Sequence, residues 1–305
     1  MTGILKYRSF TSVLIFEMNE HKVWLVTGSS GGLGRAVVEH VLLQGSKVVA
    51  TCRKTSGLDD LVAKYPLSQL VVVRLDVTIA SEITAAFACA IEAFGRIDVV
   101  YNNAGFMTMA EIEGTTEEYA RSIFEVNFWG AANVSREAVR VFRDVNSPPG
   151  GRLLQALSRG GIQAVPGVGY YCATKFALEG LSECLQSEVH PSWNIKITHL
   201  QLGSFTTRIF NPATESLVVL PQHPAYNQPD NKARLSREWM EPGRQVHGDP
   251  NKAAREIYKI ASNNDVGLRV VVGQDALAAA NEKLVELQEY IRNSEEFSTD
   301  LKFDS

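Results

Sequence analysis

The sequence predicts a single α/β domain built on a doubly wound parallel sheet. Apolar runs typical of buried strands alternate along the chain with patterns of helical spacing, and this alternation favours a parallel sheet covered by helices. The first strand runs directly into a glycine-rich turn, residues 27–34, and a helix follows that turn. With 305 residues and 45% hydrophobic content, the chain can bury a full core, and one large domain is expected rather than two.

The first half of the chain contains the clearest strand and helix patterns. After the glycine-rich turn, apolar residues recur at helical spacing as far as Val41, and Gly45 is a natural end for that helix. A second helix is predicted from about Ser81 to Phe94, where Gly95 closes it. The strands predicted in this half are residues 23–26, 48–50, 70–76 and 97–101.

The second half is expected to hold long helices and a substrate loop. Residues 115–118 form a capping box for a helix whose apolar pattern continues towards Val141. The proline-rich connection from about residue 204 to 248 is predicted to be a lid over a substrate. Residues 251–262 and 276–291 are then predicted helices, and residues 268–272 a strand. The expected organisation is an appendage of unassigned role at 1–20, the domain at 21–292 and a tail at 293–305.

The glycine-rich turn predicts a nucleotide-binding site. Strand, turn, helix and strand within about thirty residues form a βαβ unit, whose first turn can hold a pyrophosphate at the N-terminus of the helix. Glycines are needed there because the backbone must approach the phosphates closely. A Gly/Ser-rich turn without a ligand is the alternative, but the flanking strand and helix favour nucleotide binding.

A second pattern predicts proton-transfer chemistry. Tyr171 and Lys175 stand four residues apart at the start of a predicted helix, which puts phenol and ammonium on one face, and Ser158 precedes them. A free tyrosine loses its proton near pH ~10, about three units too high for easy exchange at neutral pH. A cation at ~4 Å is worth ~4 kcal/mol at an effective dielectric of about 20, so we expect Lys175 to lower the tyrosine pKa in a dry site. A core tyrosine beside a solvated lysine is the alternative.

Five motifs follow one another in the chain: Thr27-Gly28-x-x-x-Gly32-x-Gly34, Asn102-Asn103-Ala104-Gly105, Asn127 in Val126-Asn127-Phe128-Trp129-Gly130, Ser158, and Tyr171-x-x-x-Lys175. In this order they resemble the classical short-chain dehydrogenases/reductases over roughly residues 22–292. The resemblance implies a Rossmann fold, an oxidoreductase activity and a nicotinamide cofactor.

The resemblance also implies roles for four catalytic residues. By it, Tyr171 is the general acid/base and Ser158 holds the substrate oxygen. Lys175 binds the nicotinamide ribose and lowers the tyrosine pKa, and Asn127 supports a proton relay through water. These roles fit the chemistry, since reduction of a ketone by hydride leaves an alkoxide that needs a proton and a second hydrogen bond. For Asn127, a buried amide that satisfies helix backbone is an alternative compatible with the relay.

The end of the second strand distinguishes the two nicotinamide cofactors. An acidic residue there binds the ribose 2′-hydroxyl of NAD(H), whereas a basic residue accepts the 2′-phosphate of NADP(H). This sequence has Arg53 and Lys54 and no carboxylate, so NADP(H) is predicted, with a solvated basic turn as the alternative. The predicted cofactor-binding residues are Gly28, Ser30, Gly32, Leu33, Gly34, Arg53, Lys54, Asp76, Val77, Asn103, Ala104, Gly105, Tyr171, Lys175, Gly203, Phe205 and Thr206.

Three segments are expected to build the substrate pocket: residues 106–112, 159–170 and 204–248. Their apolar residues predict a bulky lipophilic carbonyl or alcohol rather than a sugar or a charged acid, unless they merely pack the loop. The residues predicted to contact the substrate are Met107, Met109, Ser158, Ile162, Val165, Tyr171 and Phe210.

Two positions depart from the family pattern. Leu202-Gly203 replaces the usual Pro-Gly beside the nicotinamide, and Leu157 precedes Ser158 where a second serine is frequent, with the unusual Arg159 after it. These changes affect the expected pocket shape more than the chemistry. We therefore predict an NADPH-dependent carbonyl reductase or alcohol dehydrogenase of EC 1.1.1 type. The alternatives are a reductase of another bond, such as an imine or a natural-product tailoring step, and a cofactor-binding regulatory protein with a vestigial site.

Composition bears on partners and location. The net charge of −4 gives no reason to expect nucleic acid, and the apolar run Val13–Phe16 is too short to span a bilayer. The four cysteines show neither metal spacing nor a disulfide framework, and the histidines show no metal pattern, so reduced thiols, no metal and a cytoplasmic location are expected. In the resembled family, the helix after the capping box and the helix of Tyr171 commonly form an intersubunit bundle, which implies a homodimer or homotetramer.

Overall fold

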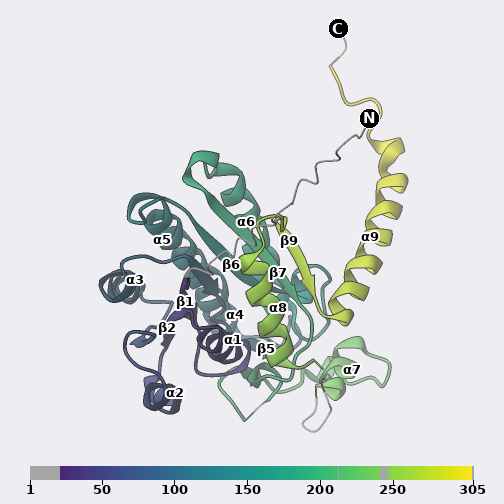
Figure 1. Ribbon diagram of the computed structural model, residues 1–305. Coiled ribbons are helices and arrows are strands. Elements are labelled where there is room, and N and C mark those ends of the chain that lie inside the picture. The colour runs from purple at the N-terminus through teal and green to yellow at the C-terminus, as the bar shows by residue number, and fades with distance from the viewer. Residues whose placement is uncertain (1–20, 212, 241–245, 247, 304–305) are drawn as a thin grey trace, which may run out of the picture.

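Seven parallel strands form one sheet in the order β3-β2-β1-β4-β6-β7-β9 (Figure 1). The structure is a computed structural model that describes residues 21–211, 213–240, 246 and 248–303, so the predicted appendage at 1–20 lies outside the described residues. The strands are β1 (Val23–Thr27), β2 (Lys47–Cys52), β3 (Leu70–Arg74), β4 (Val99–Asn102), β6 (Gly151–Ser158), β7 (Ile195–Leu202) and β9 (Arg269–Val272). The strand order reverses between β1 and β4, which confirms the doubly wound α/β fold.

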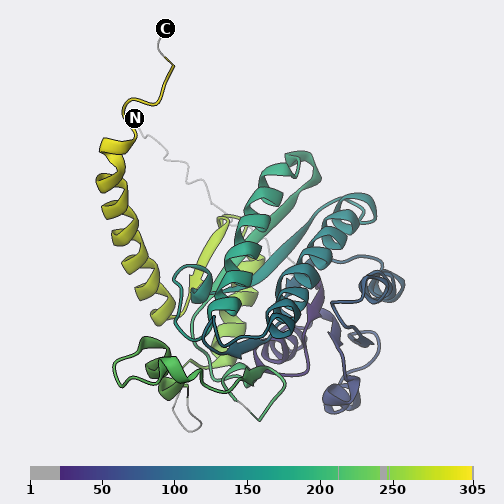
Figure 2. The same ribbon diagram turned by 180° about the vertical axis from the view of Figure 1, so that it is seen from behind.

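Helices cover both faces of the sheet. α1 (Gly32–Leu43) and α8 (Pro250–Ser262) pack on one face, in front of the sheet in Figure 1. α3 (Ala80–Phe94), α5 (Ala131–Asp144) and α6 (Gly169–Glu188) cover the other face, which Figure 2 shows from behind. The central strand β1 is therefore buried along its whole length, and this explains why its sequence is a continuous apolar run.

The helix ends follow the glycine signals in the sequence. Gly45, just after α1, and Gly95, the C-cap of α3, both have left-handed backbone angles, with φ of +79° and +80°. The predicted capping box lies at the start of α4 (Glu117–Phe124), where the Thr116 side chain accepts a hydrogen bond from the backbone N–H of Tyr119. The apolar pattern after it indeed continues through α5, because only a π-helical segment, Glu125–Gly130, separates the two helices.

A buried polar network ties α5 and α6 to the middle of the sheet. The Asn102 side-chain amide donates to the Gln155 side chain at 2.9 Å and to the Ala131 carbonyl at 2.8 Å. The Gln155 amide in turn donates to the hydroxyls of Ser135 and Ser182, at 2.6 and 3.2 Å. Because every partner in this chain of bonds is buried, the network fixes the helix that carries the tyrosine and lysine motif against β4 and β6.

The described part of the connection after β7 carries elements of its own. It contains β8 (Leu217–Val219), which pairs in parallel with β5 (Met107–Met109), and α7 (Lys232–Trp239). Residues 212, 241–245 and 247 of the predicted lid lie outside the described residues. After the lid, α8, β9 and α9 (Gln274–Ser294) follow within three residues of the predicted positions. The short helix α2 (Asp59–Lys64) completes the set, and α9 extends away from the sheet edge at β9 (Figure 1).

Candidate active site

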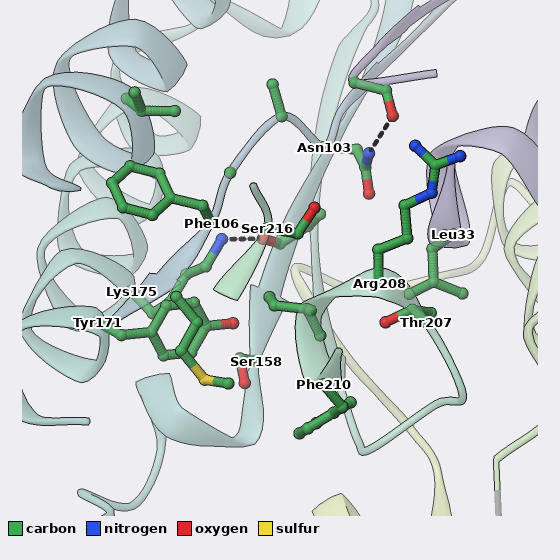
Figure 3. A pocket seen from close by; sticks show the side chains of 18 of the residues that line it. Leu33, Asn103, Phe106, Ser158, Tyr171, Lys175, Thr207, Arg208, Phe210 and Ser216 are labelled. Atoms are coloured by element: carbon green, nitrogen blue, oxygen red, sulfur yellow. Dashed lines mark hydrogen bonds between the residues drawn. The ribbon is translucent and has the colours of Figure 1, made fainter. Parts of the chain in front are cut away.

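A cavity of about 530 Å³ lies at the carboxyl ends of the parallel strands. Its wall includes residues at or just after the ends of β1, β2, β4, β6 and β7, the start of α6, and lid residues on both sides of β8. Open α/β sheets bind ligands at this edge, outside the point where the strand order reverses. Figure 3 shows that side chains from the sheet, from α6 and from the lid converge there.

The glycine-rich turn forms one end of the cavity. Gly28 and Gly32 have φ values of +70° and +57°, which other residues rarely adopt. A Cβ added at Gly34 would lie 2.4 Å from the carbonyl oxygen of Gly28, so this glycine permits the close approach of α1 to the turn. Gly31, the N-cap of α1, provides no side-chain cap, and the first N–H groups of the helix remain free to bind an anion.

The turn after β4 is fixed to the end of β1. The Thr27 hydroxyl accepts hydrogen bonds from the backbone N–H groups of Asn103 and Ala104, at 2.9 and 3.0 Å. The Asn103 amide donates to the carbonyl oxygen of Thr27 at 2.9 Å. Two motifs that lie 75 residues apart in the sequence therefore form one rigid wall, because Asn103 also approaches Gly28.

Ser158, Tyr171 and Lys175 meet on the opposite wall. A Cβ added at Gly160 would lie 3.5 Å from both the Ser158 hydroxyl and the Tyr171 ring, so both side chains border the same glycine. The Lys175 ammonium lies 5.7 Å from the centre of the Tyr171 ring and donates to the Ala156 carbonyl oxygen at 2.8 Å. Figure 3 shows the three side chains around the same part of the cavity.

Burial sets the protonation states of this group. Burial raises the pKa of the Tyr171 phenol to about 12, although its interaction with Ser158 acts in the opposite direction. Burial lowers the pKa of the Lys175 ammonium to about 8. Desolvation of the phenolate dominates, so the pKa of Tyr171 lies above its ordinary value in this structure, and the expected lowering of that pKa by Lys175 stays a prediction. At neutral pH the phenol is protonated and is poised to donate a proton rather than to accept one.

Asn127 is fully buried and does not line the cavity. Its side-chain oxygen accepts from the Phe106 N–H at 3.0 Å, and its amide donates to the Phe106 carbonyl oxygen at 2.8 Å. The amide also approaches the Thr174 hydroxyl at 3.3 Å, and Thr174 donates to the Tyr171 carbonyl oxygen. The π-helical segment thus places Asn127 where it holds the start of α6 and the segment after β4 together, which is the structural role left open by the sequence.

Most of the predicted cofactor-binding residues line the cavity. Those in its wall are Gly28, Ser30, Gly32, Leu33, Arg53, Asp76, Val77, Asn103, Ala104, Gly105, Tyr171, Lys175, Gly203 and Phe205. Gly34, Lys54 and Thr206 are not in it. Thr206 is exposed and donates to the backbone of Val246, and Thr207 faces the cavity in its place. Nothing local in the sequence shows which of two adjacent threonines points inward, so the role of Thr206 in cofactor binding stays a prediction.

The predicted 2′-phosphate site contains a lid carboxylate. Arg53 and Lys54 bind the two carboxylate oxygens of Glu215, at 2.8 and 2.7 Å. All three side chains are more than half exposed, so each ion pair contributes little and can be exchanged for another anion. No pattern in the sequence pointed to Glu215, which lies 161 residues after Lys54.

Five of the seven predicted substrate contacts line the cavity, and their role as substrate contacts stays a prediction. Met107, Ser158, Val165, Tyr171 and Phe210 line the cavity, whereas Met109 and Ile162 do not. Met109 is instead buried in β5, in the apolar cluster beneath the lid. The sequence did not single out further wall residues, because the positions of α4, β8 and α7 over the pocket depend on tertiary contacts. These residues are Tyr119, Val218, Trp239 and Met240.

The segment that departs from the family pattern is fixed by α9. The Asp275 carboxylate accepts a hydrogen bond from the backbone N–H of Ser204 at 2.8 Å, and it lies 3.8 Å from the guanidinium of Arg159. A Cβ added at Gly203 would lie 2.0 Å from an Asp275 oxygen, so glycine is required there. Leu202 lines the same cavity as Ser158 and Tyr171.

Fold and site together define a nucleotide-binding oxidoreductase, and comparison with known proteins gives its family. The family model for short chain dehydrogenases matches residues 22–217, and the chain belongs to this family. It is 35% identical over 284 residues to an uncharacterized oxidoreductase of Schizosaccharomyces pombe, covering 92% of this chain and 91% of that protein.

Two further comparisons bear on structure and activity. A short-chain dehydrogenase structure from Streptomyces avermitilis matches with a TM-score of 0.83 and 34% identity, over 93% of this chain and 100% of that one. A Bacteroides thetaiotaomicron protein named 3-ketodihydrosphingosine reductase is 35% identical over 186 residues, which cover 61% of this chain and 65% of that protein.

The cavity fits the nicotinamide dinucleotide that this family binds. The side-chain-free face of the glycine turn and the uncapped start of α1 suit a diphosphate. The wall includes Arg53, which follows β2, as well as Tyr171 and Lys175 on α6, so one cavity connects the residues predicted for the two halves of a dinucleotide. Of the described residues, no helix is long and apolar enough to cross a membrane, and no group of side chains is arranged to hold a metal ion.

Proposed function

We propose that this protein is an NADPH-dependent carbonyl reductase of EC 1.1.1 type that acts on a bulky lipophilic ketone. The observation that carries the proposal is the convergence of Ser158, Tyr171 and Lys175 on a cavity that also contains the glycine turn. Two hydroxyls on one wall serve one carbonyl oxygen, with Tyr171 donating the proton and Ser158 a second hydrogen bond. The bound nicotinamide supplies the hydride.

The protonation states support the reductive direction. With a pKa of about 12, the Tyr171 phenol keeps its proton at neutral pH and delivers it to the more basic oxygen of a forming alkoxide. Lys175 remains mostly cationic below a pH of about 8, and its charge stabilises the phenolate left behind. Asn127 acts as a positioning residue, since its contacts hold the segment before α4 and the start of α6 in register.

Arg53 and Lys54 support the choice of NADP(H). They provide two cations beyond the end of β2, where the 2′-phosphate of this cofactor is bound in doubly wound folds. Their present partner, Glu215, is a carboxylate from the lid, and it occupies the pair much as a phosphate would. Replacing Arg53 with Asp is expected to shift relative kcat/KM towards NADH. Unchanged relative kcat/KM values would contradict the NADP(H) assignment.

The apolar side of the cavity supports a lipophilic substrate. Met107, Val165, Phe210 and Trp239 surround the space beside Tyr171 and Ser158. The relative named 3-ketodihydrosphingosine reductase is, by its name, a reductase of a keto group, which agrees with a ketone as substrate here.

We also propose a homodimer or homotetramer in the cytoplasm. Three large apolar side chains are exposed on the π-helical segment and on α6: Trp129, Phe176 and Leu181. Exposed apolar surface of this kind favours contact with another subunit. The four cysteines are all free thiols, as a reducing compartment favours.

The proposal is tested by the loss of near-ultraviolet NADPH absorbance with a panel of ketones, aldehydes and imines. We expect turnover with ketones that carry large apolar groups, and higher kcat/KM with NADPH than with NADH. Turnover of imines alone would assign the site to another bond type. Cofactor binding without turnover of any carbonyl would favour the regulatory alternative, for which the altered Leu202-Gly203 segment is the one supporting observation.

A further inference from the structure

We propose that Arg208 binds the diphosphate of the cofactor and clamps it against the glycine turn. Arg208 begins a short 3-10 turn, Arg208–Phe210, in the lid segment, well away in sequence from the glycine motif. A Cβ added at Gly31 would lie 2.5 Å from the Nε atom of Arg208 and 2.7 Å from its Cζ atom. The guanidinium therefore lies directly on the glycine turn. Both residues line the cavity, and Figure 3 shows the side chain extending from the lid towards Leu33 and Asn103.

The contact also involves the residue next to Arg208. A Cβ added at Gly32 would lie 3.3 Å from the Cβ of Thr207, so two consecutive lid residues cover two consecutive glycines. Side chains at positions 31 and 32 would displace the lid segment. These glycines thus serve the lid as well as the cofactor.

The charges at this contact need an anion. The N-terminus of a helix carries partial positive charge, and α1 has neither a side-chain cap nor an acidic residue in its first turn. Arg208 adds a full positive charge at the same end. Among the described residues, its guanidinium forms no hydrogen bond or ion pair, whereas two other arginines of the lid, Arg234 and Arg237, are both paired. A diphosphate between guanidinium and helix would satisfy both donors at once.

Arg208 and the Arg53–Lys54 pair address different phosphates. Arg53 and Lys54 follow β2 and are held by Glu215, while Arg208 lies over the start of α1. The first position matches the 2′-phosphate and the second the diphosphate that NAD(H) and NADP(H) share. The inference rests on the nicotinamide cofactor of the proposed function but not on the choice between its two forms.

The test compares four ligands by titration calorimetry on wild type and Arg208→Ala: NADPH, NADH, ADP-ribose and 2′-AMP. A hydrogen-bonded charge at the diphosphate is worth on the order of tenfold to a hundredfold in affinity. We expect Arg208→Ala to raise the Kd of NADPH, NADH and ADP-ribose by a common factor in that range. The Kd of 2′-AMP, which has no diphosphate, should be unchanged. Arg208→Lys should recover part of the loss.

Two further variants separate this inference from the proposed cofactor preference. Arg53→Ala should weaken the binding of NADPH and 2′-AMP but not that of NADH or ADP-ribose. If it does not, the NADP(H) assignment is contradicted, while the affinities expected for Arg208→Ala are unaffected. Arg234→Ala, in the same lid but outside the cavity wall, should leave all four affinities unchanged. Wild-type affinity of Arg208→Ala for ADP-ribose would overturn the inference. So would an equal loss for 2′-AMP, because it would indicate a displaced lid.

Discussion

At the scale of single residues, burial has opposite effects on the two members of the Tyr171–Lys175 pair. It makes the phenol a weaker acid and the ammonium a stronger one, so their pKa values, which are close together in the free side chains, move apart to about 12 for Tyr171 and about 8 for Lys175. The spacing of the two residues was visible in the sequence. The pKa shifts were not, because they depend on how completely β6, α6 and the lid exclude water.

The shifted pKa of Lys175 predicts a specific dependence of stability on pH. The unfolded lysine keeps its proton up to a pH of about 10.5, whereas the folded one loses it at about 8. Relative to Lys175→Met, the wild-type protein should therefore gain stability as pH rises between these values, by up to about 3 kcal/mol. Below a pH of about 8, the difference between the two proteins in the free energy of unfolding should not depend on pH.

Urea unfolding of both proteins at several pH values in this window measures the effect. Lys252→Met, an exposed position on α8, is the matched control and should show no such trend. Parallel stability curves for wild type and Lys175→Met would mean that Lys175 titrates normally in the folded state.

At the scale of elements, the features that depend on neighbouring residues could be predicted from the sequence, whereas the features that depend on contacts between distant segments could not. The ends of α1 and α3 follow from Gly45 and Gly95, since a left-handed residue can be inferred from sequence. The pairing of β5 with β8 and the return of α7 over the cavity could not be inferred, because they depend on contacts between segments about a hundred residues apart. For the same reason Arg208 and Glu215 escaped prediction, although the glycine turn that Arg208 covers was clear.

A buried ion pair holds the lid in place. Arg237 on α7 binds both carboxylate oxygens of Glu111 at 2.7 Å. The Glu111 carboxylate also accepts a hydrogen bond from the backbone N–H of His223. The side chains are only 13% and 1% exposed, and the bond to Arg237 lowers the pKa of Glu111 to about 2. This pair should stabilise the closed lid at all pH values above about 4.5 and lose that effect as pH falls towards 2.

Glu111→Gln leaves the Arg237 guanidinium buried without its partner charge. We expect a loss of about 3 kcal/mol in the free energy of opening the lid, which is read from amide hydrogen exchange over β8 and α7. Glu113→Gln, at an exposed neighbouring carboxylate bonded to Tyr226, should change lid exchange by less than about 0.5 kcal/mol. Equal protection of the lid in both variants would show that the ion pair does not hold it.

At the scale of the whole molecule, the lid connects the substrate side of the cavity to the nucleotide side. Its Glu215 reaches Arg53 and Lys54, and its α7 reaches Glu111 beside the substrate pocket. Binding of a 2′-phosphate must therefore compete with a lid contact. Cofactor and lid are expected to influence each other through these residues.

Removing that competition should favour NADPH. Glu215→Gln removes two exposed ion pairs, each worth about 0.2–1 kcal/mol. Their loss should tighten NADPH binding by about two- to thirtyfold and leave NADH binding unchanged. Fluorescence titration measures both Kd values, with Glu238→Gln in the same lid as control. Weaker NADPH binding by Glu215→Gln would indicate that the carboxylate assists the cofactor instead of competing with it.

The most direct test of the proposed chemistry is the turnover of a ketone substrate by Tyr171→Phe. This variant keeps the ring and removes only the hydroxyl that donates the proton, so kcat should fall by roughly 10²–10⁴-fold while the Kd for NADPH stays within about twofold. Tyr170→Phe, one residue earlier and outside the cavity wall, should retain wild-type kcat. Comparable turnover by Tyr171→Phe and wild type would contradict the assignment of Tyr171 as the proton donor.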